Sequence, residues 1–148
     1  MTDEYSVTVR REIVAPPEEL FDAWLDAESL GTWLRPGGIQ ETRAETDPRE
    51  GGSFRIVMVE DESSIVHTGT YLEIDRPRRL VFTWSSPATK FRDSLVTVTF
   101  EASAGATVVE IHQVGLPDEE SRRSHEGGWS GALEMLDRTM QSETTAEP

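Results

Sequence analysis

The chain has 148 residues, no cysteine and a formal net charge of −14 at pH 7. The absence of cysteine excludes disulfides, thiolate metal sites and a cysteine nucleophile. The excess of acidic side chains, 28 against 14 basic ones, argues against nucleic acid and anionic membrane surfaces as partners, because phosphates are bound by clustered Lys and Arg.

The length predicts one domain, able to bury a core and still enclose a cavity. Residues 1–11 are polar and lack the apolar run of a signal peptide, and no stretch approaches the roughly 18 apolar residues of a membrane span. The sequence therefore predicts a cytoplasmic protein with no membrane span. Order is expected over residues 5–141, whereas the polar residues 142–148 have no periodicity and are expected to fray.

The first third of the chain predicts one strand followed by two short helices. Tyr5–Val14 alternates and is rich in β-formers. Residues 15–19 combine two prolines with two glutamates, which suit the first turn of a helix. A second short helix ends at Arg35–Gly38, because a proline there disfavours helix and the glycines permit a turn.

From Ile39 the pattern changes to the alternation of half-buried strands. Six strands are predicted: Ile39–Thr46, Ser53–Glu60, Ile65–Asp75, Leu80–Ser85, Ser94–Glu101 and Thr107–Val114. Their short connections imply antiparallel neighbours, because a parallel pair needs a long crossover. Gly69 inside the third of these strands indicates a bulge or the close approach of another group.

The last long segment, from Asp118 to about Gln141, predicts an amphipathic helix. Its apolar residues recur at helical spacing: Trp129, Leu133, Leu136 and Met140. Glycines at 127, 128 and 131 interrupt it, each costing about 1 kcal/mol relative to alanine. Either another element packs closely against them, which we favour, or they leave space beside Trp129 for a bound molecule.

A sheet with one apolar face and a helix with one apolar stripe bury each other most simply in a two-layer α+β domain. The run Gly69–Trp84, GTYLEIDRPRRLVFTW, resembles the central signature of the SRPBCC, or START-like, superfamily. Within it, the chain is most similar to the C-terminal domain of the activator of heat-shock protein 90 ATPase. Three further stretches agree with this resemblance: Ile13–Phe21, Gly51–Arg55 and His125–Trp129.

The resemblance implies a helix-grip (START-like, birch-pollen-allergen-like) fold. In this fold a curved, antiparallel seven-stranded sheet wraps a long C-terminal helix, with two short helices after strand 1. Members often enclose a cavity for apolar small molecules, and others bind protein partners. Where close relatives tend to carry a histidine near the end of the last strand, this chain has Gln113, so histidine chemistry is not expected there.

The larger side chains expected on the concave face are the candidates for lining such a cavity. They are Trp33, Phe54, Met58, Tyr71, Trp84, Phe100, Gln113, Trp129 and Leu133. Aromatic walls with a few polar groups are typical of small-molecule sites, although the same residues also fit a filled core. Gln113 is the most informative, because a glutamine on an apolar strand face needs hydrogen-bond partners or a bound polar group.

No cofactor or metal is expected. The three histidines lack metal-ligand spacing, and the chain has neither a Walker loop nor a GxGxxG run. His67 and Tyr71 share one parity of their strand, but Leu72 and Ile74 compete for the interior with the opposite parity, so the pattern does not fix the buried face. Glu73 beside arginines is more simply a surface ion pair.

Three functions remain open. The leading hypothesis is a non-enzymatic START-like domain that binds an apolar small molecule between the sheet and the C-terminal helix. The second is a co-chaperone-like module stimulating the heat-shock protein 90 ATPase, although a first strand at Tyr5 leaves no room for the N-terminal domain of full activators. The third is a polyketide cyclase or dehydratase-like enzyme, with His67, Tyr71 and Glu73 as its acid/base candidates. The sequence is compatible with a monomer or a homodimer.

Overall fold

The computed structural model describes residues 5–146, with side chains of the last helix described up to Ser142. The elements in chain order are β1 (Tyr5–Ile13), α1 (Pro17–Leu25), α2 (Ala27–Trp33), β2 (Glu41–Thr46), β3 (Ser53–Glu60), β4 (Ser63–Asp75), β5 (Arg79–Trp84), the short 3-10 turn η1 (Pro87–Thr89), β6 (Ser94–Ser103), β7 (Ala106–Leu116) and α3 (Glu119–Ala146). Their order confirms the predicted sequence of one strand, two short helices, six strands and a long helix.

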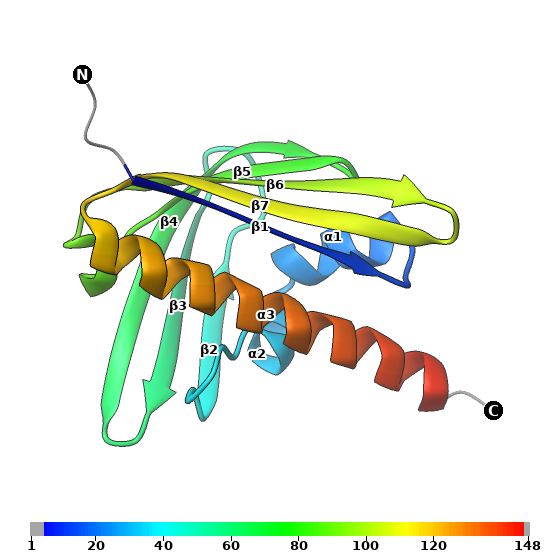
Figure 1. Cartoon of the computed structure of the whole chain (residues 1–148), viewed down its shortest axis with the longest axis horizontal. Coiled ribbons are helices and arrows are strands. Elements are labelled where there is room, and N and C mark those ends of the chain that lie inside the picture. Colours follow the sequence, from blue (N-terminus) through cyan, green and yellow to red (C-terminus); the bar gives the residue numbers. More distant parts are fainter. Residues whose placement is uncertain (1–4, 147–148) are drawn as a thin grey trace.

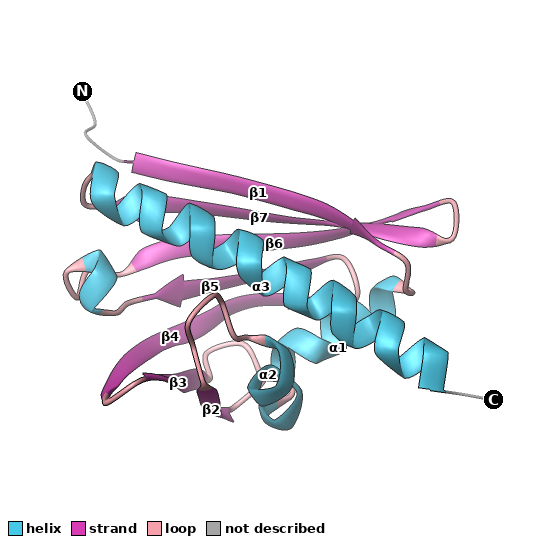
Figure 2. Ribbon diagram, turned by 60° about the horizontal axis from the view of Figure 1, so that its bottom comes forward, coloured by secondary structure: helices cyan, strands magenta, loops and turns pink. Residues whose placement is uncertain are grey.

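The seven strands form one antiparallel sheet in the order β1-β7-β6-β5-β4-β3-β2. The sheet curves, so that β2, β3 and β4 turn away from the plane of β1, β7 and β6 (Figure 1). Helix α3 crosses the concave side, and α2 closes the same side near β2 (Figure 2). This arrangement is the helix-grip fold that the sequence resemblance implied.

Helix α3 is held on the sheet by the apolar stripe predicted for it. Trp129, Leu133, Leu136 and Met140 are all buried. Asp118 caps the helix by accepting a hydrogen bond from the Ser121 backbone N–H at 2.8 Å, as expected for an N-cap acid. The helix continues past the predicted end at Gln141, because residues 142–146 contain neither glycine nor proline to stop it.

Strand β4 presents His67 and Tyr71 to the interior, which settles the parity that the sequence left open. Leu72 is half exposed, and a register irregularity between Tyr71 and Glu73 turns the strand so that Ile74 also packs on the core. A bulge of this kind shifts the side-chain alternation by one residue. Both competing parities are therefore used, one on each side of the irregularity.

Gly69 lies where β4 passes close to its neighbours. A Cβ atom at this position would collide with the Thr83 carbonyl oxygen and the Phe54 ring. Close approach, rather than a bulge at this residue, explains the glycine, because the irregularity of β4 lies after Tyr71.

The two short helices close one end of the sheet with aromatic packing. The ring centroids of Trp24 and Trp33 lie 4.9 Å apart, and those of Phe21 and Phe100 lie 5.2 Å apart. Both pairs pack edge to face. The Trp33 indole N–H donates to the Ala23 carbonyl at 3.1 Å.

None of the helices within residues 5–146 combines the length and apolar character needed to cross a bilayer.

Candidate functional site

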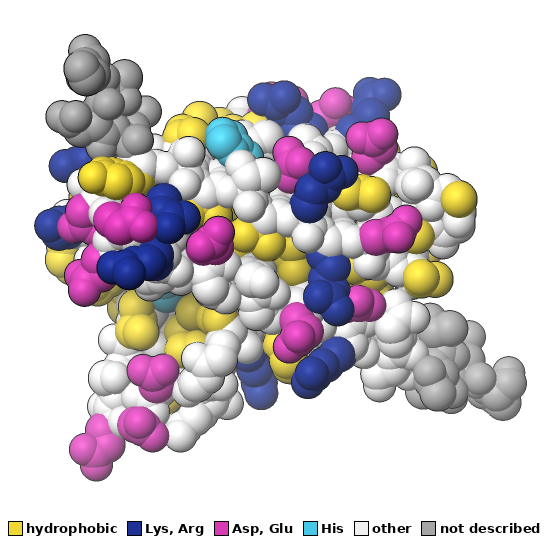
Figure 3. All heavy atoms as spheres, in the orientation of Figure 1, with side chains coloured by type: hydrophobic (Ala, Val, Ile, Leu, Met, Phe, Trp, Pro, Cys, Tyr) yellow, Lys and Arg dark blue, Asp and Glu magenta, His cyan; other side chains and the backbone are white. Residues whose placement is uncertain are grey.

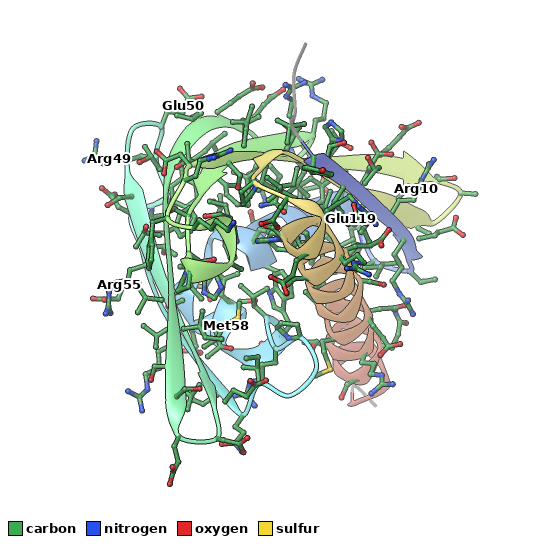
Figure 4. The ribbon with its side chains drawn as sticks, turned by 60° about the vertical axis from the view of Figure 1, so that its left-hand side comes forward. Arg10, Arg49, Glu50, Arg55, Met58 and Glu119 are labelled. Carbon is green, nitrogen blue, oxygen red and sulfur yellow. The ribbon has the colours of Figure 1, made fainter. Side chains whose placement is uncertain are left out.

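A cavity of about 420 Å³ opens between the first half of α3, the β3–β4 hairpin and the loop after α2. Its apolar wall includes Leu34, Ile39, Met58, Ile65, Trp84 and Trp129. Figure 3 shows hydrophobic side chains at the surface between the start of α3 and the hairpin, and Figure 4 shows Met58 on the inner side of the sheet while Arg55 of the same strand points outward. The volume lies within the roughly 300–1,000 Å³ of small-molecule sites.

Two tryptophans separate this cavity from the packed interior. The ring centroids of Trp84 and Trp129 lie 5.0 Å apart. Trp24 lies behind Trp129, with a centroid distance of 5.9 Å. The space behind them measures only about 20 Å³, enough for about one water molecule. The deep interior is therefore filled by aromatic side chains. The cavity lies on the other side of the tryptophan pair, toward the first turns of α3 and the β3–β4 hairpin.

A hydrogen-bonded chain fixes the Trp129 ring and ends at the backbone of Trp84. The Trp129 indole N–H donates to Gln113 Oε1 at 2.7 Å, and Gln113 Nε2 donates to Ser94 Oγ at 2.8 Å. Ser94 Oγ in turn donates to the Trp84 carbonyl at 2.7 Å. Gln113 is fully buried. The hydrogen-bond partners that the sequence required for it are supplied by side chains of the protein itself.

Two histidines line the cavity, His67 from β4 and His125 from α3. The His67 ring stacks on Trp84 with centroids 4.8 Å apart, and its Nδ1 lies 3.4 Å from the Ile56 carbonyl. Burial, together with the nearby charge that His125 carries when protonated, lowers the pKa of His67 to about 4. Burial also lowers the pKa of His125. Both rings are neutral at pH 7.

The glycines of α3 have two different roles. A Cβ atom on Gly127 or Gly128 would have no heavy atom within 4 Å, and both residues line the cavity. On Gly131 a Cβ would lie 3.6 Å from Pro36 and Gly37, in ordinary van der Waals contact. The packing explanation favoured from the sequence therefore applies to Gly131, whereas Gly127 and Gly128 border open space.

The polar side chains at the rim belong to α3. Arg123 lines the cavity with a side chain that is 69% exposed, and its nearest acid is Glu119 at 3.9 Å. Ser124 beside it is also exposed. Charge is thus confined to the solvent side of the site. Among residues 5–142, whose side chains are described, no three His, Asp or Glu side chains are grouped to hold a metal ion.

The structure divides the predicted cavity residues into three sets. Met58, Trp84 and Trp129 line the cavity of about 420 Å³ beside α3, and Phe54 and Tyr71 line the small space behind it. The remaining predicted residues line neither space: Trp33, Phe100, Gln113 and Leu133. These four are packed in the core, because the helices and the aromatic cluster fill the concavity that the sequence pattern left undivided.

Several cavity residues were not among those predicted, notably His125, Arg123 and Ser124. Spacing offered a signal for one of them. His125 precedes Trp129 by one helical turn, which places both side chains on the same face of α3. The loop residues Pro36 and Gly37 carried no such signal, since only the tertiary contact with α3 brings them to the site.

The acid/base candidates of the enzyme hypothesis do not converge. Glu73 pairs with Arg79 at 3.4 Å on the outer surface, as expected of a surface ion pair. Tyr71 lies behind the tryptophans, and burial raises the pKa of its hydroxyl, which stays protonated at neutral pH. Of the three candidates, His67 alone lines the large cavity.

Comparisons with known proteins agree with this architecture. A family model described as Activator of Hsp90 ATPase homolog 1-like protein matches residues 14–141. The crystal structure of an AHSA1 protein from Silicibacter pomeroyi is 26% identical, covers 94% of this chain and 99% of its own, and superposes with a TM-score of 0.77. A protein from Chromobacterium violaceum is 25% identical over 90% of this chain and 95% of its own, with a TM-score of 0.79. No curated protein sequence matches significantly.

Proposed function

The chain belongs to the family of activator of Hsp90 ATPase homolog 1-like proteins, and we propose that it binds a small hydrophobic molecule in the cavity between the sheet and α3. The fold is of a ligand-binding type, and the cavity has the size and aromatic lining of small-molecule sites. Trp84, Trp129 and Met58 supply the apolar contact surface in this proposal, with His67 and His125 as its polar groups.

One observation carries the proposal: two helical glycines border empty space. Glycine inside a helix is less stable than alanine by about 1 kcal/mol, and this loss is normally offset by close packing. At Gly127 and Gly128 no neighbour would touch a Cβ atom, so packing does not account for them. A bound molecule lying against the helix backbone does account for them.

A thermal-unfolding screen tests the proposal with fatty acids, sterols, flavonoids and aromatic polyketides, alongside the apolar fluorescent probe N-phenyl-1-naphthylamine. A ligand at a hundred times its dissociation constant stabilises the folded state by about 2.7 kcal/mol. For a domain of this size the midpoint is then expected to rise by roughly 5–10 °C. If no compound raises the unfolding midpoint and the fluorescent probe does not bind, the proposal is contradicted.

Filling the cavity locates the site. Gly128→Leu places a side chain in the open space, so the ligand-induced shift should disappear. Ser130→Leu is the matched control, because it adds the same side chain two residues later on the exposed side of α3. If Gly128→Leu keeps the full shift, the ligand binds elsewhere.

The family description supports a second candidate, stimulation of the Hsp90 ATPase. This function would use the protein surface and would not require the cavity. Gly128→Leu should therefore leave stimulation unchanged in an ATPase assay with the purified chaperone. Absence of both stimulation and co-purification with the chaperone would remove this candidate.

A further inference from the structure

The two cavity histidines are not needed for a purely apolar site. This inference rests on the proposed function: we infer that the cavity selects an aromatic ligand with a neutral hydroxyl group, which donates a hydrogen bond to a ring nitrogen of His67 or to Nε2 of His125. The ligand class is thus a phenol-type hydrogen-bond donor rather than a carboxylate or a plain hydrocarbon.

A hydrogen bond of His125 fixes which of its ring nitrogens is free to accept. His125 Nδ1 lies 2.7 Å from the Ser121 carbonyl oxygen. A carbonyl only accepts, so Nδ1 carries the proton and Nε2 of the neutral ring keeps its lone pair. The His67 ring lies beside the backbone carbonyls of Ile56, 3.4 Å from its Nδ1, and Ile65. Each neutral ring keeps one acceptor nitrogen, which in His125 is Nε2.

The charge state of the rings disfavours a carboxylate in the inner part of the cavity. Burial lowers the pKa of both histidines, so neither supplies a positive charge at pH 7. A carboxylate buried beside two neutral acceptors has no donor to compensate its lost hydration. The cation of the lining, Arg123, is on the exposed rim and attracts an acid there.

The shape of the site favours a flat ligand. The His67 ring stacks on Trp84, and the Trp84 and Trp129 rings are inclined at 54° to each other. In the same cavity wall, the glycine pair that precedes Trp129 in α3 presents backbone without side chains. Aromatic rings pack against such ring faces and edges with centroids about 4.5–7 Å apart, so a planar ligand can lie against the tryptophan rings beside the glycines.

Four matched naphthalenes test the inference by isothermal titration calorimetry at pH 7: 2-naphthol, 2-methoxynaphthalene, naphthalene and 2-naphthoate. The unaltered protein should bind 2-naphthol roughly three- to tenfold more tightly than 2-methoxynaphthalene, as one net hydrogen bond predicts, and more tightly than naphthalene and 2-naphthoate. His67→Phe and His125→Phe keep a ring but remove the acceptor, so the variant that lacks the accepting histidine should lose this preference. His112→Phe, on the outer face of β7, should keep it.

The outcomes separate the inference from the proposed function. Equal binding of 2-naphthol and 2-methoxynaphthalene would overturn the hydroxyl preference while leaving a hydrophobic site in place. Tighter binding of 2-naphthoate would overturn it in favour of an acid held by Arg123. If none of the four ligands binds, the inference fails, and the probe and screen described above decide whether the proposed function fails with it. The ligand series on the unaltered protein decides even if a variant does not fold.

Discussion

At the scale of single residues, Gln113 shows how a polar side chain in the core positions the site. It links the Trp129 indole to Ser94, and Ser94 to the backbone of Trp84. A fully satisfied buried network of this kind fixes side-chain orientation, because every alternative rotamer leaves a polar group unpaired. The tryptophan wall of the cavity therefore depends on a residue that does not line it.

Gln113→Leu should destabilise the protein by about 1–3 kcal/mol, because the buried Trp129 N–H loses its acceptor. Chemical denaturation followed by circular dichroism measures the loss. Trp129→Phe removes the same N–H, so the double variant should lose less than the sum of the two single variants. Additive losses would show that the hydrogen bond contributes nothing.

His67 should make the fold sensitive to mild acid. Its pKa is about 4 in the folded protein against 6.5 in the unfolded chain, so between these values the unfolded state binds more protons. The contribution of a neutral His67 to the free energy of unfolding is therefore fully present above pH 6.5 and is lost as the pH falls toward 4. The loss is about 3 kcal/mol, at 1.36 kcal/mol per pKa unit. Urea unfolding at several pH values should show a shallower fall for His67→Phe.

The same slope in His67→Phe as in the unaltered protein would assign the acid sensitivity to other groups. His125 contributes in the same direction as His67, because its pKa is also lowered.

At the scale of elements, α3 combines a buried stripe with an unfilled stretch. Its second half packs its apolar residues against the sheet, whereas Gly127 and Gly128 in its first half border the cavity. The same helix thus closes the core and forms one wall of the candidate site. Stability and ligand space compete within it.

Gly127→Ala and Gly128→Ala should each stabilise the protein by about 0.5–1 kcal/mol, because alanine is the better helix former and the added methyl meets nothing. The midpoint of thermal unfolding should rise by roughly 2–4 °C per kcal/mol. Gly131→Ala, with contacts at 3.6 Å, should also be tolerated. A lower midpoint for the first two variants would mean that the space beside α3 is not open.

Gly69→Ala should act in the opposite direction. Its methyl would overlap the Thr83 carbonyl and the Phe54 ring, and overpacking against backbone costs about 1–3 kcal/mol or more. Guanidinium unfolding measures this loss. Gly37→Ala is the control, because no atom lies within 4 Å of its added methyl. Equal stability of the two variants would contradict the close approach in β4.

At the scale of the whole molecule, acidic side chains outnumber basic ones by two to one. Ion pairs such as Arg76 with Asp22, at 2.8 Å, lie on the surface, where each contributes little. Even if every basic residue paired with an acid, 28 minus 14 leaves 14 carboxylates without a cationic partner. Self-repulsion therefore outweighs the surface pairs.

Salt should consequently stabilise the fold. Raising NaCl from 10 mM to 100 mM shortens the Debye length from about 30 Å to about 10 Å and screens the repulsion among the acids. Differential scanning calorimetry should record a higher unfolding midpoint in the higher salt, and choline chloride should act alike because the effect is not specific to sodium. A lower midpoint would show that the ion pairs dominate.

The sequence by itself determined the elements and the fold. Alternation over Ile39–Val114 and helical spacing in Asp118–Gln141 identified the sheet and α3, because these periods depend only on neighbours along the chain. The resemblance in Gly69–Trp84 gave the helix-grip arrangement. The stripe of α3 and the inward parity of Gln113 were also correct.

Tertiary structure alone decided the shape of the cavity. Strand β4 changes its inward parity at an irregularity that no local period reveals. Packing filled the space around Trp33 and Phe100 but left space beside Gly127, because the unfilled volume depends on side chains brought together from distant segments. His67 and His125 line one cavity for the same reason: the curvature of the sheet, rather than their spacing in the chain, brings both residues there.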